Sequence, residues 1–121
     1  MEYTSIEIID SVVAAGVSYT IAKMSFGRRV ELTRRIRELA ARKEFVEAGE
    51  TANEKMEAAL LASEIDRIYL LWGLQEVAGL EVDGAPATPE SLAAAGPEEL
   101  FREALAAVKR QCGLSDAERK N

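Results

Sequence analysis

The chain has 121 residues, of which 48% are apolar and 30% are charged, so it is long enough for one domain with its own core. It contains no histidine, which removes the commonest general base and the commonest zinc ligand. Cys112 is the single cysteine, which excludes a disulfide within the chain. The composition therefore favours a protein that is not an enzyme, and no sequence motif implies a cofactor or a metal site.

The compartment is indicated by what the sequence lacks. No segment approaches the roughly 18 consecutive apolar residues of a membrane span. The first residues have neither the basic start nor the apolar run of a signal peptide. We therefore expect a cytoplasmic protein without membrane contact.

Residues 1–26 are predicted to form a β-hairpin. Ile6 and Ile8 alternate with polar residues, and Val17, Tyr19 and Ile21 do the same further along the chain. Alternating β-branched and aromatic residues are typical of strands. We expect residues 5–12 to pair with residues 17–24.

Residues 27–77 are predicted to form two long antiparallel helices. Ser25 is a suitable N-cap for a first helix over 27–48, and the capping-box pattern from Thr51 to Glu54 begins a second helix over 52–77 that Gly79 ends. Trp72 lies on the apolar stripe of the second helix and is expected in the core. About three residues join the helices, which favours antiparallel packing.

Residues 78–121 are predicted to form a small hairpin and short helices. Asp83-Gly84 is a two-residue turn signal within 80–87. Thr88 followed by Pro89 begins a helix that continues to about residue 95, and a further helix runs from about 97 to 112, with a last capping box at 115–118. The predicted fold is thus α+β, mainly α, in one domain over residues 1–121.

The charge is distributed unevenly along the chain. The net charge is −6, but residues 28–43 hold seven basic and two acidic side chains, or +5, which leaves −11 for the remainder. Three arginines of this segment, Arg28, Arg35 and Arg42, recur every seven residues along one flank of the predicted helix. They are the first candidates for a binding site, together with Arg34 and with Tyr69, which lies one step off the apolar stripe of the second helix.

Three interpretations of this basic helix are open. Its arginines can pair with the acidic helix over 52–77 or simply be solvated, bind an acidic protein partner, or contact nucleic acid. A net charge of −11 elsewhere makes nucleic acid the weakest of the three, because phosphates repel an acidic surface. Catalysis is not indicated, since Cys112 has no histidine partner in the chain and is expected to be buried near the end of a helix.

Four stretches resemble the phage tail assembly chaperones, which are small proteins of tailed-phage and prophage tail operons: VSYTIAKMSFGRRVEL (17–32), IYLLWGL (68–74), PATPE (86–90) and GLSDAERKN (113–121). The resemblance implies a non-enzymatic role in virion morphogenesis, with the tape-measure protein and the tail tube subunit as partners in the host cytoplasm. It carries over no individual binding residue. The alternative is a small DNA-binding regulator that uses residues 28–43. Pairing of the hairpin over 5–24 with a second copy would give a homo-oligomer.

Overall fold

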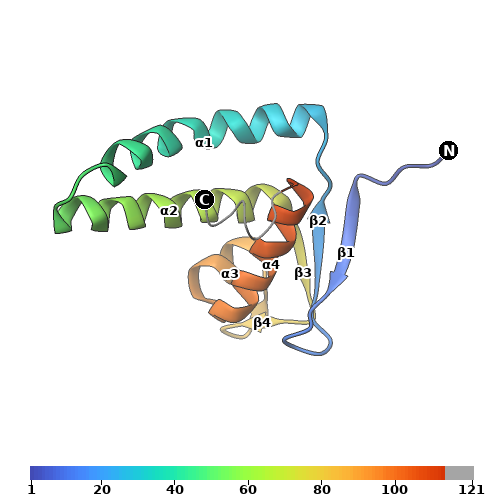
Figure 1. Ribbon diagram of the computed structural model, residues 1–121. Helices are drawn as coiled ribbons and strands as arrows, with labels where there is room; N and C mark the ends of the chain where they lie inside the picture. Colours follow the sequence, from blue (N-terminus) through green and yellow to red (C-terminus); the bar gives the residue numbers. More distant parts are fainter. Residues whose placement is uncertain (114–121) are drawn as a thin grey trace.

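Residues 1–113 are described by a computed structural model, in which a three-stranded sheet packs against four helices (Figure 1). The capping box expected at 115–118 lies outside these residues. The elements, in chain order, are β1 (Ile6–Asp10), β2 (Ser18–Ala22), α1 (Phe26–Glu47), α2 (Ala52–Gly73), β3 (Leu74–Ala78), β4 (Glu81–Val82), β5 (Ala85–Pro86), α3 (Pro89–Ala95) and α4 (Glu98–Gln111). The predicted α+β, mainly α, fold with an N-terminal hairpin and a long helix pair is confirmed.

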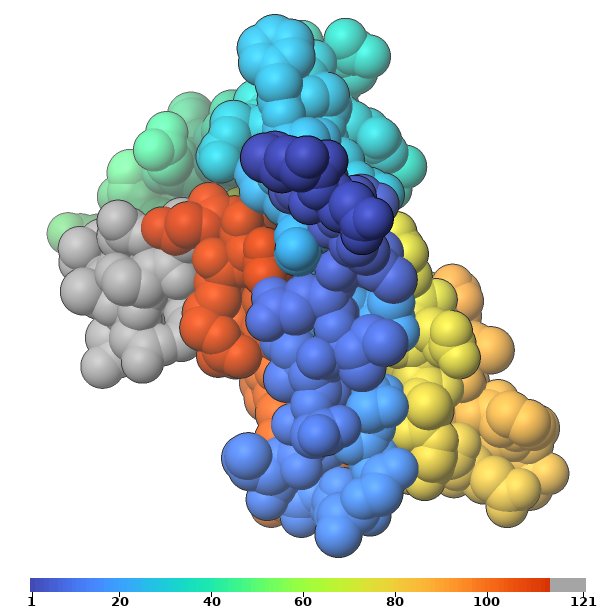
Figure 2. Space-filling model, turned by 90° about the vertical axis from the view of Figure 1, so that its right-hand side faces the viewer, coloured from blue at the N-terminus to red at the C-terminus, as the bar shows by residue number. Residues whose placement is uncertain are grey.

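The sheet is antiparallel in the order β1–β2–β3, so β2 is central. The predicted N-terminal hairpin is confirmed, with the register running from Ile6 opposite Ala22 to Asp10 opposite Ser18. Tyr19 and Ile21 on β2 are fully buried, since one face of the sheet packs against α4 and the core. The strands lie side by side on the other face, which no helix covers (Figure 2).

The expected helix over 52–77 is wrong at its C-terminal end. Helix α2 ends at Gly73, and the next five residues form β3, which pairs with β2 through Tyr19 opposite Val77 and Ile21 opposite Leu74. A side chain at Gly73 would collide with Val108 of α4, whose Cγ1 would lie 2.5 Å from the new Cβ. Helix α2 therefore closely approaches α4 at Gly73, where the chain enters the sheet, and Gly79 follows a strand and does not end a helix.

Helices α1 and α2 are antiparallel neighbours, as predicted, and their far halves extend beyond α3 and α4 (Figure 1). The expected caps are present: the hydroxyl of Ser25 accepts the N–H of Arg28, and Thr51 and Glu54 form a capping box. The far half of the pair has its own small core of buried residues, to which only α1 and α2 contribute: Val46, Ala58 and Leu61, with Leu39 packed against them.

The C-terminal elements follow the prediction closely. Asp83 and Gly84 have φ angles of 53° and 82°, and two positive φ angles in succession are what a type I′ turn between β4 and β5 requires. Thr88 caps α3, with Pro89 in its first turn. Helix α4 ends at Gln111 and is followed by Gly113 at φ 80°, the left-handed conformation typical of a helix C′ position.

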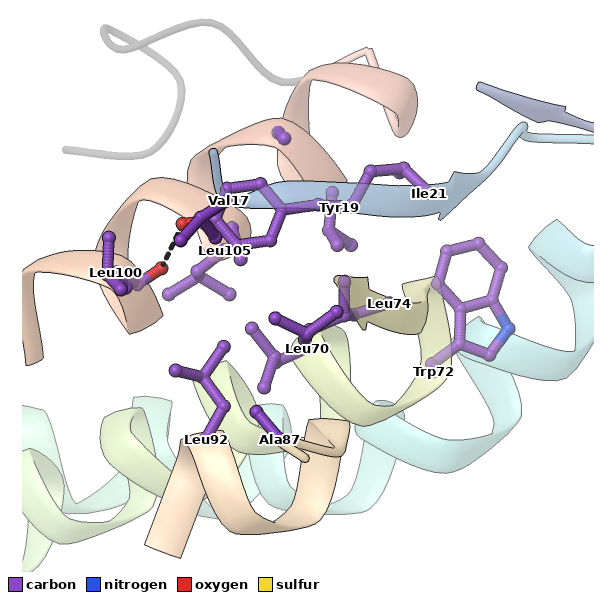
Figure 3. Packing of buried hydrophobic residues seen from close by; sticks show 14 of the residues in the cluster. Val17, Tyr19, Ile21, Leu70, Trp72, Leu74, Ala87, Leu92, Leu100 and Leu105 are labelled. Carbon is purple, nitrogen blue, oxygen red and sulfur yellow. Dashed lines mark hydrogen bonds between the residues drawn. The ribbon is translucent and has the colours of Figure 1, made fainter. Parts of the chain in front are cut away.

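The main core lies between the sheet, α2, α3 and α4 (Figure 3). Leu70, Leu92 and Val108 are almost fully buried. Trp72 is 6% exposed and lies at the end of this cluster next to α1, so its predicted place in the core is confirmed. Cys112 is buried as well, as expected.

Candidate protein-binding surface

One face of α1, its inner face, packs against α2, and the rest of the helix surface does not. Leu32, Ile36, Leu39 and Val46 return at intervals of three, four and seven residues, the spacing that keeps side chains on one helix face. Leu32 and Val46 are the buried residues of α1. The arginines of the helix therefore lie either on a flank of this face or on the side turned away from α2, whereas the half-buried Lys43 shares the inner face.

The three arginines that recur every seven residues lie on the flank and are engaged within the chain. The guanidinium of Arg28 lies 5.8 Å from the ring centroid of Trp72. Arg35 pairs with Glu31 at 2.9 Å, and Arg42 reaches Glu57 of α2 at 3.5 Å. Pairing with the acidic helix thus occurs at Arg42, whereas Arg28 and Arg35 have other partners.

Three further arginines of α1 are arranged differently. Within the described part of the chain, no carboxylate oxygen lies within 4 Å of Arg29, Arg34 or Arg37. All three are exposed and, together with Val30 and Thr33, they line a surface hollow of about 540 Å³. Within residues 1–113, their positive charge is therefore not neutralised by an ion pair.

Large apolar side chains accompany these arginines on the side of α1 that faces away from α2. Phe26 is 87% exposed, Val30 43% and Phe45 80%. At 3.6 residues per turn these residues fall on one side of the helix with two of the arginines. We call this set the outer stripe, and its members are Phe26, Val30, Arg34, Arg37 and Phe45.

Sequence reasoning found only part of the outer stripe. The sequence predicts Arg34 as a candidate but not Arg37, Phe26, Val30 or Phe45, because the prediction places apolar residues at helical spacing on the core side alone. The sequence does indicate this surface, because α1 carries a second apolar set that is offset around the helix from Leu32 and Leu39 by more than a quarter of a turn. A second apolar set on an exposed helix face is a candidate contact surface.

Tyr69, the other candidate, lies inside the fold and away from the outer stripe. It is half-buried, and the Nζ atom of Lys109 lies 5.4 Å from its ring centroid. It lines a small cavity of about 100 Å³ with Met24, Leu32 and Cys112. Burial raises the pKa of the Tyr69 phenol, and Cys112 and Asp66 add to this effect.

The densest polar cluster of the molecule is centred on Glu103 of α4, which sequence reasoning missed. Its carboxylate accepts hydrogen bonds from the hydroxyls of Ser11 and Tyr19 and from the N–H groups of Val12 and Val13. Burial by itself would raise the pKa of Glu103, but these hydrogen bonds outweigh it and lower the pKa below its ordinary value. Burial, followed by the hydrogen bond to Glu103, raises the pKa of Tyr19, so the phenol remains a donor.

This cluster is a structural joint. It fastens the loop after β1 to α4, and each oxygen of the carboxylate accepts two hydrogen bonds. Among residues 1–113, no group of three or more His, Cys, Asp or Glu side chains is placed so that it could hold a metal ion. In that same part of the chain, no helix combines the length and apolar character needed to cross a membrane.

Compared with known proteins, the chain matches no family model, no curated protein and no solved structure. The resemblance to phage tail assembly chaperones therefore stays a prediction.

Proposed function

We propose that the chain is a non-enzymatic tail assembly chaperone that binds a partner protein in phage-like tail morphogenesis, in the cytoplasm of the host cell. The outer face of α1 carries this proposal. Arg34 and Arg37 have no carboxylate within 4 Å among the described residues, and they lie between the exposed side chains of Phe26 and Phe45. Exposed aromatic residues combined with arginine are the side chains that protein interfaces favour.

The charge of the molecule favours a protein over nucleic acid as the partner. Residues outside 28–43 carry a net charge of −11. Within α1 itself, Glu38 borders the outer stripe beside Arg34 and Arg37, Glu44 borders it beside Phe45, and both would face phosphates at close range. A partner with a mixed apolar and acidic surface avoids this repulsion. The resemblance names the tape-measure protein and the tail tube subunit as such partners.

The test is an affinity pull-down of the tagged protein from its phage or cell lysate, with and without nuclease, followed by mass spectrometry. We expect nuclease treatment to leave the recovery of a tape-measure or tube protein unchanged. The double variant Arg34→Glu/Arg37→Glu should lose this protein, whereas Arg67→Glu, an exposed arginine of α2, should retain it. Recovery of nuclease-sensitive material alone would overturn the proposal in favour of the DNA-binding regulator.

A further inference from the structure

We infer that the outer stripe of α1 binds an amphipathic α-helix of the partner, with carboxylates at the middle of that helix and large apolar side chains near both ends. The inference rests on the proposed function, because it specifies which segment of the partner is bound. It follows from the order of the stripe: Phe26 and Val30 lie at one end, Arg34 and Arg37 in the middle and Phe45 at the other end.

The length of the stripe sets the length of the partner helix. Phe26 and Phe45 are 19 residues apart. At about 1.5 Å of rise per residue, this separation corresponds to roughly 28 Å, or about five turns. A partner helix of about 20 residues therefore spans the stripe, and its apolar residues contact both phenylalanines.

The outer stripe of a second copy is a poor occupant. Arg34 and Arg37 lie near the midpoint between Phe26 and Phe45, so two stripes aligned at their apolar ends place arginine opposite arginine in either orientation. Like charges at an interface oppose association. An occupant with carboxylates in the middle removes this repulsion and neutralises the two arginines.

Charges beside the stripe restrict where the carboxylates of the partner can lie. Glu44 precedes Phe45 on α1, and Glu38 follows Arg34 by one turn. Both are exposed, and neither is paired within residues 1–113. Glu44 repels carboxylates near Phe45, so the acidic residues of the partner fit best opposite Arg34 and Arg37, where Glu38 offsets part of the positive charge.

The inference is tested with three labelled synthetic peptides of about 22 residues. The first has leucine and phenylalanine at both ends of one helix face and glutamate at its middle. The second has lysine in place of those glutamates, and the third has the composition of the first with its apolar residues distributed around the helix. Fluorescence anisotropy with the full chain, and with a 20-base-pair duplex DNA as a fourth probe, measures the affinities.

We expect saturable binding of the first peptide and at least tenfold weaker binding of the other two and of the DNA at physiological salt. The variant Arg34→Glu/Arg37→Glu should reverse the preference between the first and second peptides. Phe45→Ala should weaken the first peptide at least fivefold, whereas the matched control Leu60→Ala, an exposed leucine of α2 on the side away from α1, should not. Circular dichroism of each variant checks that its fold is intact.

Equal binding of the first and third peptides, an unchanged preference in the charge-reversed variant, or tighter binding of DNA would overturn the inference. Failure of the inference and failure of the proposed function are distinguishable. If the peptides fail while the lysate still yields a tape-measure or tube protein, the partner binds in another way. If the peptides bind as expected and no tail protein is captured, the helix-binding surface stands and the chaperone role does not.

Discussion

The hydroxyl of Tyr19 on β2 donates a 2.8 Å hydrogen bond to the carboxylate of Glu103 on α4, which also accepts a bond of 2.5 Å from Ser11. The N–H group of Val12 adds a third bond of 2.8 Å. One carboxylate therefore joins the central strand, the loop after β1 and the helix that covers the sheet.

Replacement of Glu103 by alanine should lower the free energy of unfolding. The change leaves the Tyr19 hydroxyl and two backbone N–H groups without their acceptor, and loss of hydrogen bonds to a charged group costs about 2–3 kcal/mol. Chemical denaturation measures the free energy of unfolding. Glu99→Ala, at an exposed position of the same helix, is the control and should change it by at most about 1 kcal/mol, because Glu99 contributes only to the helix dipole. Similar values for the two variants would contradict this role of Glu103.

The same carboxylate should make stability depend on pH in a defined direction. The pKa of Glu103 is lower in the folded chain than its ordinary value, so its ionised form stabilises the fold above that value, which is about 4.3. This contribution is lost as the pH falls through the lowered folded-state pKa. We therefore expect the difference in unfolding free energy between the natural chain and Glu103→Gln to shrink progressively as the pH falls below the ordinary glutamate pKa. A difference that stays constant on acidification would show that Glu103 is not the titrating group.

Gly79 should tolerate no side chain, for two separable reasons. Its φ is 81°, and an added Cβ would collide with the carbonyl oxygen of Gly16 in the loop after β1. Gly84 has a similar φ of 82° but nothing within 4 Å of such a Cβ. We expect Gly84→Ala to cost about 1 kcal/mol from backbone strain alone, and Gly79→Ala to cost clearly more. Thermal unfolding of both variants measures the difference, and equal costs would mean that the close approach to Gly16 relaxes freely.

Asp66 of α2 connects two helices through ion pairs, at 2.8 Å to Lys109 and 3.3 Å to Arg102 of α4. The side chain of Lys109 is only 16% exposed, so Asp66→Asn leaves a poorly solvated ammonium without its partner. We expect a loss of about 1–2 kcal/mol in unfolding free energy. Glu31→Gln removes the solvent-exposed pair with Arg35 and should change stability by less than about 0.5 kcal/mol. Urea titrations measure both losses in unfolding free energy. If Asp66→Asn and Glu31→Gln lose the same amount, the burial of Lys109 does not strengthen its ion pair with Asp66.

Local signals were sufficient to predict most elements of the fold. Alternation at Tyr19 and Ile21 indicated a strand, while Thr51 and Thr88 marked two helix starts, since these features act through the residues beside them. Strand β3 was missed because Leu70, Leu71 and Leu74 satisfy helical spacing equally well. What makes a strand of residues 74–78 is pairing with β2, more than fifty residues earlier in the chain, and no local pattern records such a contact.

The candidate surface was predictable only in part for a similar reason. The interval of seven residues correctly grouped Arg28, Arg35 and Arg42, but that interval places them on the flank of α1, where Trp72, Glu31 and Glu57 engage them. Which arginines remain unpaired depends on side chains of other elements. The sequence contains a weak indication of the role of Glu103. This residue lies between Leu100 and Ala107 on the buried stripe of α4, where a carboxylate needs hydrogen-bond partners.

The small core at the far end of α1 and α2 has a consequence for how such a molecule can vary. Because Val46, Ala58 and Leu61 pack only within the helix pair, the length of the pair does not depend on contacts with the sheet. Removing or adding matched turns in both helices would alter the distance between the two ends of the outer stripe without touching Tyr19, Glu103 or β3. If the outer stripe binds a helix as we infer, a chain with a shorter or longer helix pair should bind a correspondingly shorter or longer helical segment.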